Sequence, residues 1–198
     1  MADSYLTDLI TKILDIYRNI DRQTASFQMA TGLCCPSRCG ACCESARVES
    51  TVLECLPLAN EILRRGEEDL FFGEIQEKIN RGDKRCVVFS PDEKTPGDGN
   101  CSRYDFRALV CRLFGFAARK NKFGEAEPSW CRVIKEKNPE ILKKLEGEGS
   151  YLVSAPIYQD SFMRIASLHP GLGYRLLPIN VALRDALDYL GFRRPGRL

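Results

Sequence analysis

Histidine is almost missing from this sequence of 198 residues, in which His169 is the single one. Zinc fingers that combine cysteine with histidine, and Ser–His–Asp catalysis, are therefore poorly supported. His169 precedes Pro170 and lies far from the cysteines in the sequence, so we interpret it as a loop residue rather than a metal ligand. The sequence also has no P-loop and no GxGxxG motif, so no signature of nucleotide binding is present.

A signal peptide and a membrane-spanning run are missing as well. The N-terminal residues MADSYLTD lack the basic segment, the apolar run and the small-residue cleavage site of a signal peptide. No apolar stretch approaches the length of a transmembrane helix. We therefore expect a cytoplasmic protein that binds no membrane and whose thiols stay reduced.

An excess of charge of one sign is also lacking. The 29 basic and 27 acidic residues give a formal net charge of +2. This near balance differs from the strongly basic character of proteins that bind nucleic acid, so we expect no nucleic-acid partner. We interpret the short basic tail with Arg193, Arg194 and Arg197 as solvated. The sequence identifies no protein partner and leaves room for one.

Cysteine is the residue that the sequence has in excess. The ten cysteines are Cys34, Cys35, Cys39, Cys42, Cys43, Cys55, Cys86, Cys101, Cys111 and Cys131. A chain of this length can bury a core without disulfides. In a reducing compartment, clustered cysteines are more often metal-binding or catalytic than structural. We expect Cys55 to be a buried apolar residue, because it stands between Leu53 and Leu56 on a predicted helix.

The spacing of apolar residues predicts a mainly α fold, with helices around an irregular cysteine-rich metal-binding core and at most a short β-hairpin. The predicted helices cover 3–24 (with a continuation to Gly32), 49–65, 67–81, 139–145, 156–168 and 178–190. The predicted hairpin joins 116–119 to 126–130, and 86–89 is strand-like. This divides the chain into an N-terminal helix (1–32), a cysteine-cluster metal-binding domain (33–135) and a C-terminal helical extension packed on the same domain (136–198).

The stretch from Cys35 to Cys43 can bring several thiolates to one point. Gly40 permits a tight turn within Cys39-Gly-Ala-Cys42-Cys43. Four further cysteines follow downstream and can close onto this loop. Adjacent side chains usually diverge, so Cys42 and Cys43 would serve two centres, or one would bind metal while the other packs. Four thiolates form a closed zinc site and equally hold an iron–sulfur cluster.

The compound cysteine pattern resembles the bacterial YkgJ-type cysteine-cluster proteins, the CxxCxxCC or zinc- or iron-chelating domain family. Cys39-Gly-Ala-Cys42-Cys43 matches the core of the family pattern. Its later positions are matched by Cys86, Cys101, Tyr104, Arg107, Cys111, Arg112, Phe114 and Cys131. The chain departs from the pattern in a first gap of three residues instead of two, which makes Cys35 the first ligand with Cys34 as the alternative. Asp105, Ala108 and Gly115 replace a glutamate and two prolines.

The resemblance implies that the chain chelates metal. The ligands it implies are Cys35, Cys39, Cys42, Cys43, Cys86, Cys101, Cys111 and Cys131. We favour an iron–sulfur cluster of the 4Fe–4S kind, with structural zinc as the alternative and a thiol redox protein as the least favoured reading. The cluster also resembles that of flagellin lysine methylases, where it accompanies methyl transfer. The sequence does not decide whether this chain is an enzyme.

Arg107 and Arg112 flank Cys111 and are the candidate cofactor-binding cations. A thiolate-rich site is negative, so guanidinium groups nearby would stabilise it and could donate hydrogen bonds to sulfur. The alternative is an ordinary ion pair of either arginine with Asp105. We interpret Tyr104 and Phe114 as packing around the site.

Overall fold

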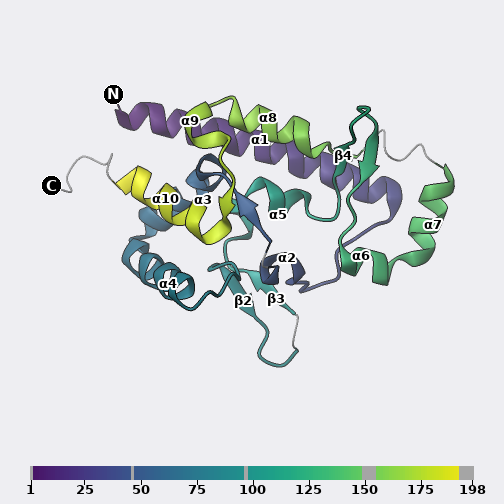
Figure 1. The fold of residues 1–198 in the computed structure, drawn as a ribbon, viewed down its shortest axis with the longest axis horizontal. Coiled ribbons are helices and arrows are strands. Elements are labelled where there is room, and N and C mark those ends of the chain that lie inside the picture. The colour runs from purple at the N-terminus through teal and green to yellow at the C-terminus, as the bar shows by residue number, and fades with distance from the viewer. Residues whose placement is uncertain (1, 46, 96–97, 149–154, 192–198) are drawn as a thin grey trace.

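The computed structural model describes residues 2–45, 47–95, 98–148 and 155–191, and over these ranges the fold is mainly helical, as predicted (Figure 1). The helices are α1 (Ala2–Thr31), α2 (Ala41–Glu44), α3 (Val52–Arg65), α4 (Glu68–Asn80), the 3-10 helix η1 (Tyr104–Phe106), α5 (Leu109–Leu113), α6 (Arg132–Lys137), α7 (Pro139–Glu148), α8 (Tyr158–Ala166), α9 (Pro170–Gly173) and α10 (Ile179–Gly191). None of the helices in these ranges combines the length and the apolar character that crossing a bilayer requires.

The long helix α1 forms one edge of the molecule, with α8 beside it (Figure 1). Ile13, Tyr17, Ile20 and Phe27 recur at helical spacing, and each is at most 1% exposed. This apolar stripe holds the helix against the rest of the chain. The predicted helix is confirmed and continues to Thr31, after which Gly32 takes a φ of 74°.

Helix α3 lies at the centre of the fold, and α10 packs along it. Thr51 and Glu54 form a reciprocal capping box at its N-terminus, and Gly66 ends it in the left-handed region. Pro57 lies inside the helix without ending it. The predicted helix 49–65 therefore exists, but it begins at Val52 because Glu49–Ser50 forms a strand.

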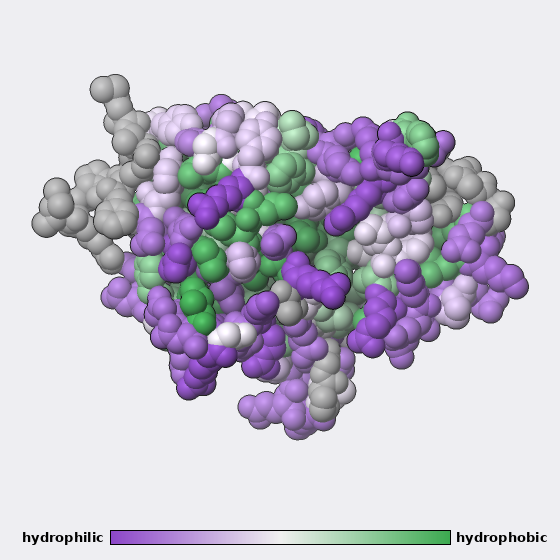
Figure 2. Space-filling model, in the orientation of Figure 1, coloured by the Kyte–Doolittle hydropathy of each residue, from purple (hydrophilic) through white to green (hydrophobic). Residues whose placement is uncertain are grey.

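Short antiparallel strand pairs complete the described part of the fold. They are β1 (Glu49–Ser50) with β6 (Leu177–Pro178), β2 (Phe89–Pro91) with β3 (Gly99–Cys101), and β4 (Ala118–Lys120) with β5 (Ala126–Pro128). The last pair is the predicted hairpin. The strand-like interpretation of 86–88 is wrong, because these residues form a turn in which the Phe89 amide donates to the Cys86 carbonyl. Hydrophilic residues cover the β2–β3 hairpin, whereas apolar residues show near α10 (Figure 2).

Two clusters of buried apolar side chains form separate cores. The larger joins α1, α3, α4, α5 and α10 and includes Cys43 and Cys86. The smaller lies around Phe27 and Ile134, where the end of α1 meets α6 and α7, and Cys131 packs against it. The cysteines therefore come from both cores.

Candidate metal centre

A cavity of about 460 Å³ brings the sequence-predicted cysteines together. The cysteines that line it are Cys35, Cys39, Cys42, Cys43, Cys101, Cys111 and Cys131. They arrive from the loop before α2, from α2 itself, from β3, from α5 and from the start of α6. Seven of the eight predicted ligands thus line one space, although they span the whole region from 35 to 131.

The cysteine loop is held against the β2–β3 hairpin. Cys39 forms an isolated antiparallel bridge with Asp98, and the Gly99 amide donates to the Arg38 carbonyl at 2.9 Å. A Cβ at Gly40 would lie 2.5 Å from the ring of Phe89. Only glycine lets this loop approach the ring so closely, so the glycine of the motif is explained by packing.

The sulfur atoms of Cys42 and Cys43 lie 4.0 Å apart. This differs from the expectation that neighbouring side chains diverge. Both residues sit in α2, a single turn after Gly40 whose backbone bonds run from Cys43 and Glu44 to the Gly40 carbonyl. Tetrahedral Zn–S bonds of about 2.3 Å separate their sulfurs by roughly 3.8 Å. The two thiols are therefore close enough to bind one centre.

The thiols of Cys42 and Cys43 differ in their pKa. A hydrogen bond from the Cys43 thiol, and then the charge of Arg107, lower the pKa of Cys42 to about 7. The pKa of Cys43 is raised by this hydrogen bond and by burial. Of the two thiols, Cys42 is thus the one that ionises first.

Cys86, the eighth predicted ligand, faces a second and enclosed space of about 30 Å³. Its amide donates to the Cys43 carbonyl at 3.1 Å, which joins the two cysteine segments directly. Cys43, Cys101 and Cys111 line this small space as well as the large cavity. These three thiols therefore border both spaces.

Burial keeps the inner thiols protonated. It raises the pKa of Cys86 to about 12 and shifts those of Cys101 and Cys111 upward. The neighbouring thiols Cys42, Cys86 and Cys101 add to the shift of Cys111. A bound cation reverses this balance because it stabilises the thiolates and displaces their protons.

Cys35, Cys39 and Cys131 form the outer part of the lining. Burial, and then Cys39, raise the pKa of Cys35 to about 12, with a smaller contribution from Cys131. Cys131 caps α6, where its sulfur accepts from the Ile134 amide at 3.4 Å. A Cβ at Gly115, whose φ is 84°, would lie 2.8 Å from Ile134 and 3.2 Å from the Cys131 sulfur, so only glycine fits beside this predicted ligand.

The side chains do not form a ready-made coordination sphere. Within the part of the chain that the structure describes, no group of three or more Cys, His, Asp or Glu side chains has the geometry of a metal site. The donor chemistry nevertheless fits zinc and iron, which thiolates bind well. The cavity and the proximity of the sulfurs match a site in which the thiols are drawn together when the metal binds.

The two candidate arginines have different surroundings. Arg107 stacks on Tyr104 at 3.4 Å from the ring centroid, donates to the carbonyls of Tyr104 and Cys111, and acts electrostatically on Cys42, Cys101 and Cys111. Arg112 is 5% exposed and lies over the ring of Tyr17. Its guanidinium pairs with Asp21 and donates to backbone carbonyls of the 105–107 segment. Both arginines line the cavity; Arg112 also ties α5 to α1, while Arg107 acts electrostatically on the thiols.

Sequence reasoning missed a polar stripe on α1. Asp21, Thr24 and Gln28 line the large cavity, and their spacing puts them on one face of the helix. Thr24 is 8% exposed, and its hydroxyl has no hydrogen-bond partner among the described residues. The signal was a polar face between the buried residues Tyr17, Ile20 and Phe27.

Tyr104 and Phe114 line the large cavity, as the expected packing around the site requires, whereas Cys34, Cys55 and His169 do not. Cys34 is exposed and does not line it. Cys55 is 1% exposed, which confirms its place in the core, and its thiol donates to the Ser50 hydroxyl. His169 lies at the start of α9, where its ring faces that of Tyr189.

These features define a helical protein with a thiol-lined cavity. The family model described as "CxxCxxCC: Putative zinc- or iron-chelating domain" matches residues 33–132. The chain belongs to this family, and its membership supports metal binding. Neither the curated proteins nor the solved structures contain a significant match to the chain.

Proposed function

We propose that the chain uses its clustered cysteines to hold an iron–sulfur cluster of the 4Fe–4S kind. The observation that carries this proposal is the cavity of about 460 Å³ with seven cysteines in its lining. Such a space exceeds what one ion with four close thiolates occupies. The predicted ligands are all sulfur, and His169 lies outside the lining, which also holds the carboxylates of Asp21 and Asp105. When bound, the cluster would supply one-electron or Lewis-acid chemistry.

We further propose that the ligands fall into two sets and that the site holds two centres. Cys43, Cys86, Cys101 and Cys111 are the predicted ligands that border the enclosed space, beside the core residue Cys55, and they form the inner set. The outer set consists of Cys35, Cys39 and Cys131. Cys42 acts electrostatically on Cys35 and on Cys111, so it stands between the sets. Two groups of thiols with different burial support centres of different exposure.

Arg107 and Arg112 have separate parts in this proposal. Arg107 would offset the negative charge of the thiolates, since it already lowers the pKa of Cys42. Arg112 would act indirectly, because it fixes the short helix α5 that carries Cys111. Both assignments follow from their contacts rather than from their place in the sequence.

Structural zinc is the second candidate. The enclosed space of about 30 Å³ favours it for the inner set, because the four predicted ligands among its five cysteines match the ligand number of a closed structural site. In that case the metal would hold the irregular region between the helices together and would take no part in a reaction.

Anaerobic purification followed by metal and sulfide analysis tests the proposal. Broad absorbance near roughly 400 nm with stoichiometric iron and sulfide is expected for an iron–sulfur protein. A colourless protein with stoichiometric zinc would contradict this and support the second candidate. A purified chain that holds neither iron nor zinc would contradict both candidate functions.

The role of the cluster is proposed to be redox or of the methyl-transfer type. The support is the open cavity with the unpartnered hydroxyl of Thr24 beside the cysteines, which offers a place for a small polar substrate. Reversible bleaching by dithionite with full retention of iron is expected for a redox role. Loss of iron on reduction would contradict it.

The cellular location and the partners of the protein are also proposed. We propose a cytoplasmic location because all ten cysteines are free thiols in the structure. The net charge of +2 supports the absence of a nucleic-acid partner. A protein partner stays open.

A further inference from the structure

A single side-chain amide holds the backbone on both sides of Cys86. Asn180 lies on α10 and is 5% exposed. Its Oδ1 accepts from the Val87 amide at 2.9 Å, and its Nδ2 donates to the Arg85 carbonyl at 2.9 Å. Asparagine is suited to this contact because its side chain presents a donor and an acceptor together.

We propose that Asn180 is a positioning residue for the metal ligand Cys86, and this inference rests on the proposed function. The amide fixes the residues before and after the cysteine, and the Cys86 amide itself is bonded to the Cys43 carbonyl. With these three bonds made, the peptide units around Cys86 cannot rotate freely. The thiol is thereby kept facing the enclosed space that it shares with Cys43, Cys101 and Cys111.

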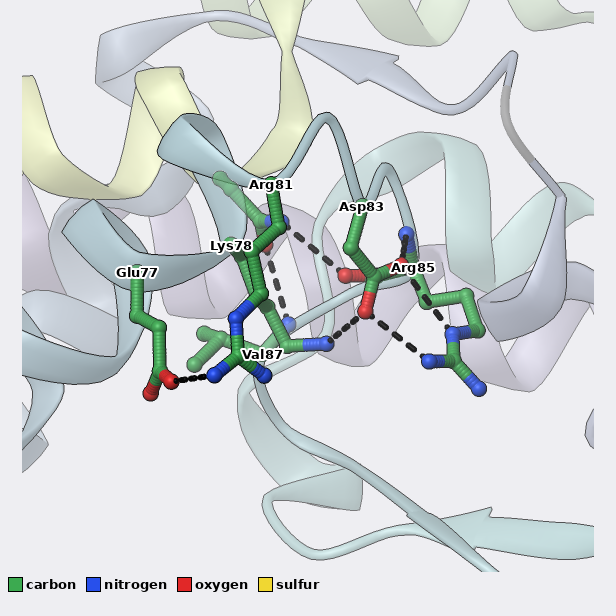
Figure 3. Close-up of polar contacts among 7 residues, drawn as sticks. Glu77, Lys78, Arg81, Asp83, Arg85 and Val87 are labelled. Carbon is green, nitrogen blue, oxygen red and sulfur yellow. Dashed lines mark hydrogen bonds and ion pairs between the residues drawn. The ribbon is translucent and has the colours of Figure 1, made fainter.

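The segment before Cys86 is braced from a third side. The Asp83 carboxylate accepts from the Lys78 ammonium at 2.8 Å and from the guanidinium and amide of Arg85 at 3.0 Å (Figure 3). These contacts hold the pKa of Asp83 below its usual value. Lys78 belongs to α4, so the turn that carries Cys86 is fixed between α4 and α10.

Asn180 lies outside the segment that carries the cysteines, on a helix whose buried positions are mostly apolar. Residues 33–132 match the metal-chelating family, whereas Asn180 lies beyond that region. The helix that carries it packs on α3 and buries Ala182, Leu183 and Ala186, and an apolar residue would fill the same buried place without a polar cost. The amide is explained by what it bonds, namely the two flanks of one predicted ligand.

Asn180→Ala in the full-length chain is the test, with Thr51→Ala as its matched control. Thr51 is buried and caps α3, so its loss lowers stability without touching the Cys86 turn. We expect Asn180→Ala to raise the alkylation rate of Cys86 in the metal-free chain about tenfold or more, since two hydrogen bonds are lost. The rates at Cys39 and Cys131 should stay near those of the unmodified chain. Peptide mass spectrometry after timed iodoacetamide treatment measures each site.

Metal affinity supplies the second measurement. A lost positioning contact weakens metal binding by about 10 to 100-fold, which competition with a chelator measures. In a Cys86→Ser background, Asn180→Ala should add little further loss, because both changes act on one ligand. The inference would be overturned by an unchanged alkylation rate at Cys86 or by an equal rise at every cysteine. It would also be overturned if Asn180→Ala weakened metal binding in the Cys86→Ser background as much as it does alone. If the chain binds no metal, the proposed function fails, while the alkylation rates still decide the role of Asn180.

Discussion

The main-chain amide of Cys86 donates a hydrogen bond to the carbonyl of Cys43 over 3.1 Å. This bond fastens a turn that follows α4 to the cysteine helix α2. The backbone alone thereby places Cys43, a predicted ligand of the local cluster, next to Cys86, a predicted ligand from downstream.

Cys131→Ala and Cys86→Ala should each remove only part of the bound metal. Cys131 belongs to the outer lining and Cys86 to the enclosed space, so two centres would be lost separately. We expect about half of the metal content to remain in each variant, as measured by elemental analysis on anaerobically purified chain. Cys34→Ala, at an exposed position outside the lining, should keep all of it. Complete loss in either variant would indicate one shared centre.

Arg112→Leu should destabilise the fold far more than Arg107→Leu. Arg112 is buried, pairs with Asp21 and satisfies two backbone carbonyls, so its removal should lower the free energy of unfolding by about 2 to 4 kcal/mol. Arg107→Leu should cost less than about 1 kcal/mol but weaken metal binding by about tenfold. Urea unfolding and chelator competition separate the two effects. Equal losses of stability would contradict the roles assigned to them.

Glu54 should make the fold less stable as the pH rises from 5 to 8. Burial raises the pKa of Glu54 to about 7, above the unfolded value of 4.5, so the folded state holds its proton more tightly. The stability that this provides is complete below the unfolded pKa and is lost as the pH rises through the folded pKa. We expect a loss of about 2 to 3 kcal/mol in the metal-free chain, measured by urea unfolding at each pH.

Glu54→Gln should flatten this pH dependence, because the amide does not titrate. Glu61→Gln is the matched control on the same helix. Arg65 and Arg64 lower the pKa of Glu61, so that group contributes no loss in this pH range. A slope that survives Glu54→Gln would mean that another group is responsible.

Gly40→Ala should loosen the cysteine loop. The added Cβ would lie 2.5 Å from the Phe89 ring, and overpacking of this kind costs about 1 to 3 kcal/mol. Gly66→Ala is not a suitable control, since Gly66 has a positive φ. Gly73→Ala is suitable, because nothing lies within 4 Å of its Cβ position. Combining Gly40→Ala with Phe89→Leu should recover part of the stability, and a failure to do so would point to the backbone instead of the ring.

The sequence predicted the helices with a clear apolar period, and these are confirmed. The apolar stripe of α1 and the C-terminal period of α10 depend on local spacing, which a single sequence displays. The turn at 86–88 could not be predicted, because its partners Cys43 and Asn180 lie far away in the sequence. The short elements η1, α5 and α6 could not be predicted for a different reason: a helix of one or two turns shows little apolar periodicity.

The candidate site was predictable in composition but not in arrangement. Cysteine spacing pointed to the residues that line the cavity, and no spacing rule could reveal that the Cys42 and Cys43 sulfurs converge to 4.0 Å. The sequence made Arg112 a candidate cofactor contact, and Arg112 does line the cavity. Its bond to Asp21 on α1 depends on tertiary packing.

The two apolar cores meet at the cysteines, with Cys43 and Cys86 in the larger core and Cys131 against the smaller one. A metal bound across them would make the two halves unfold as one cooperative unit. Without metal, hydrogen exchange in α6 and α7 should become faster than in α3 and α10, because the smaller core then lacks its strongest link to the larger. Metal bound by the thiols would thus stabilise α6 and α7, although neither helix contains a cysteine.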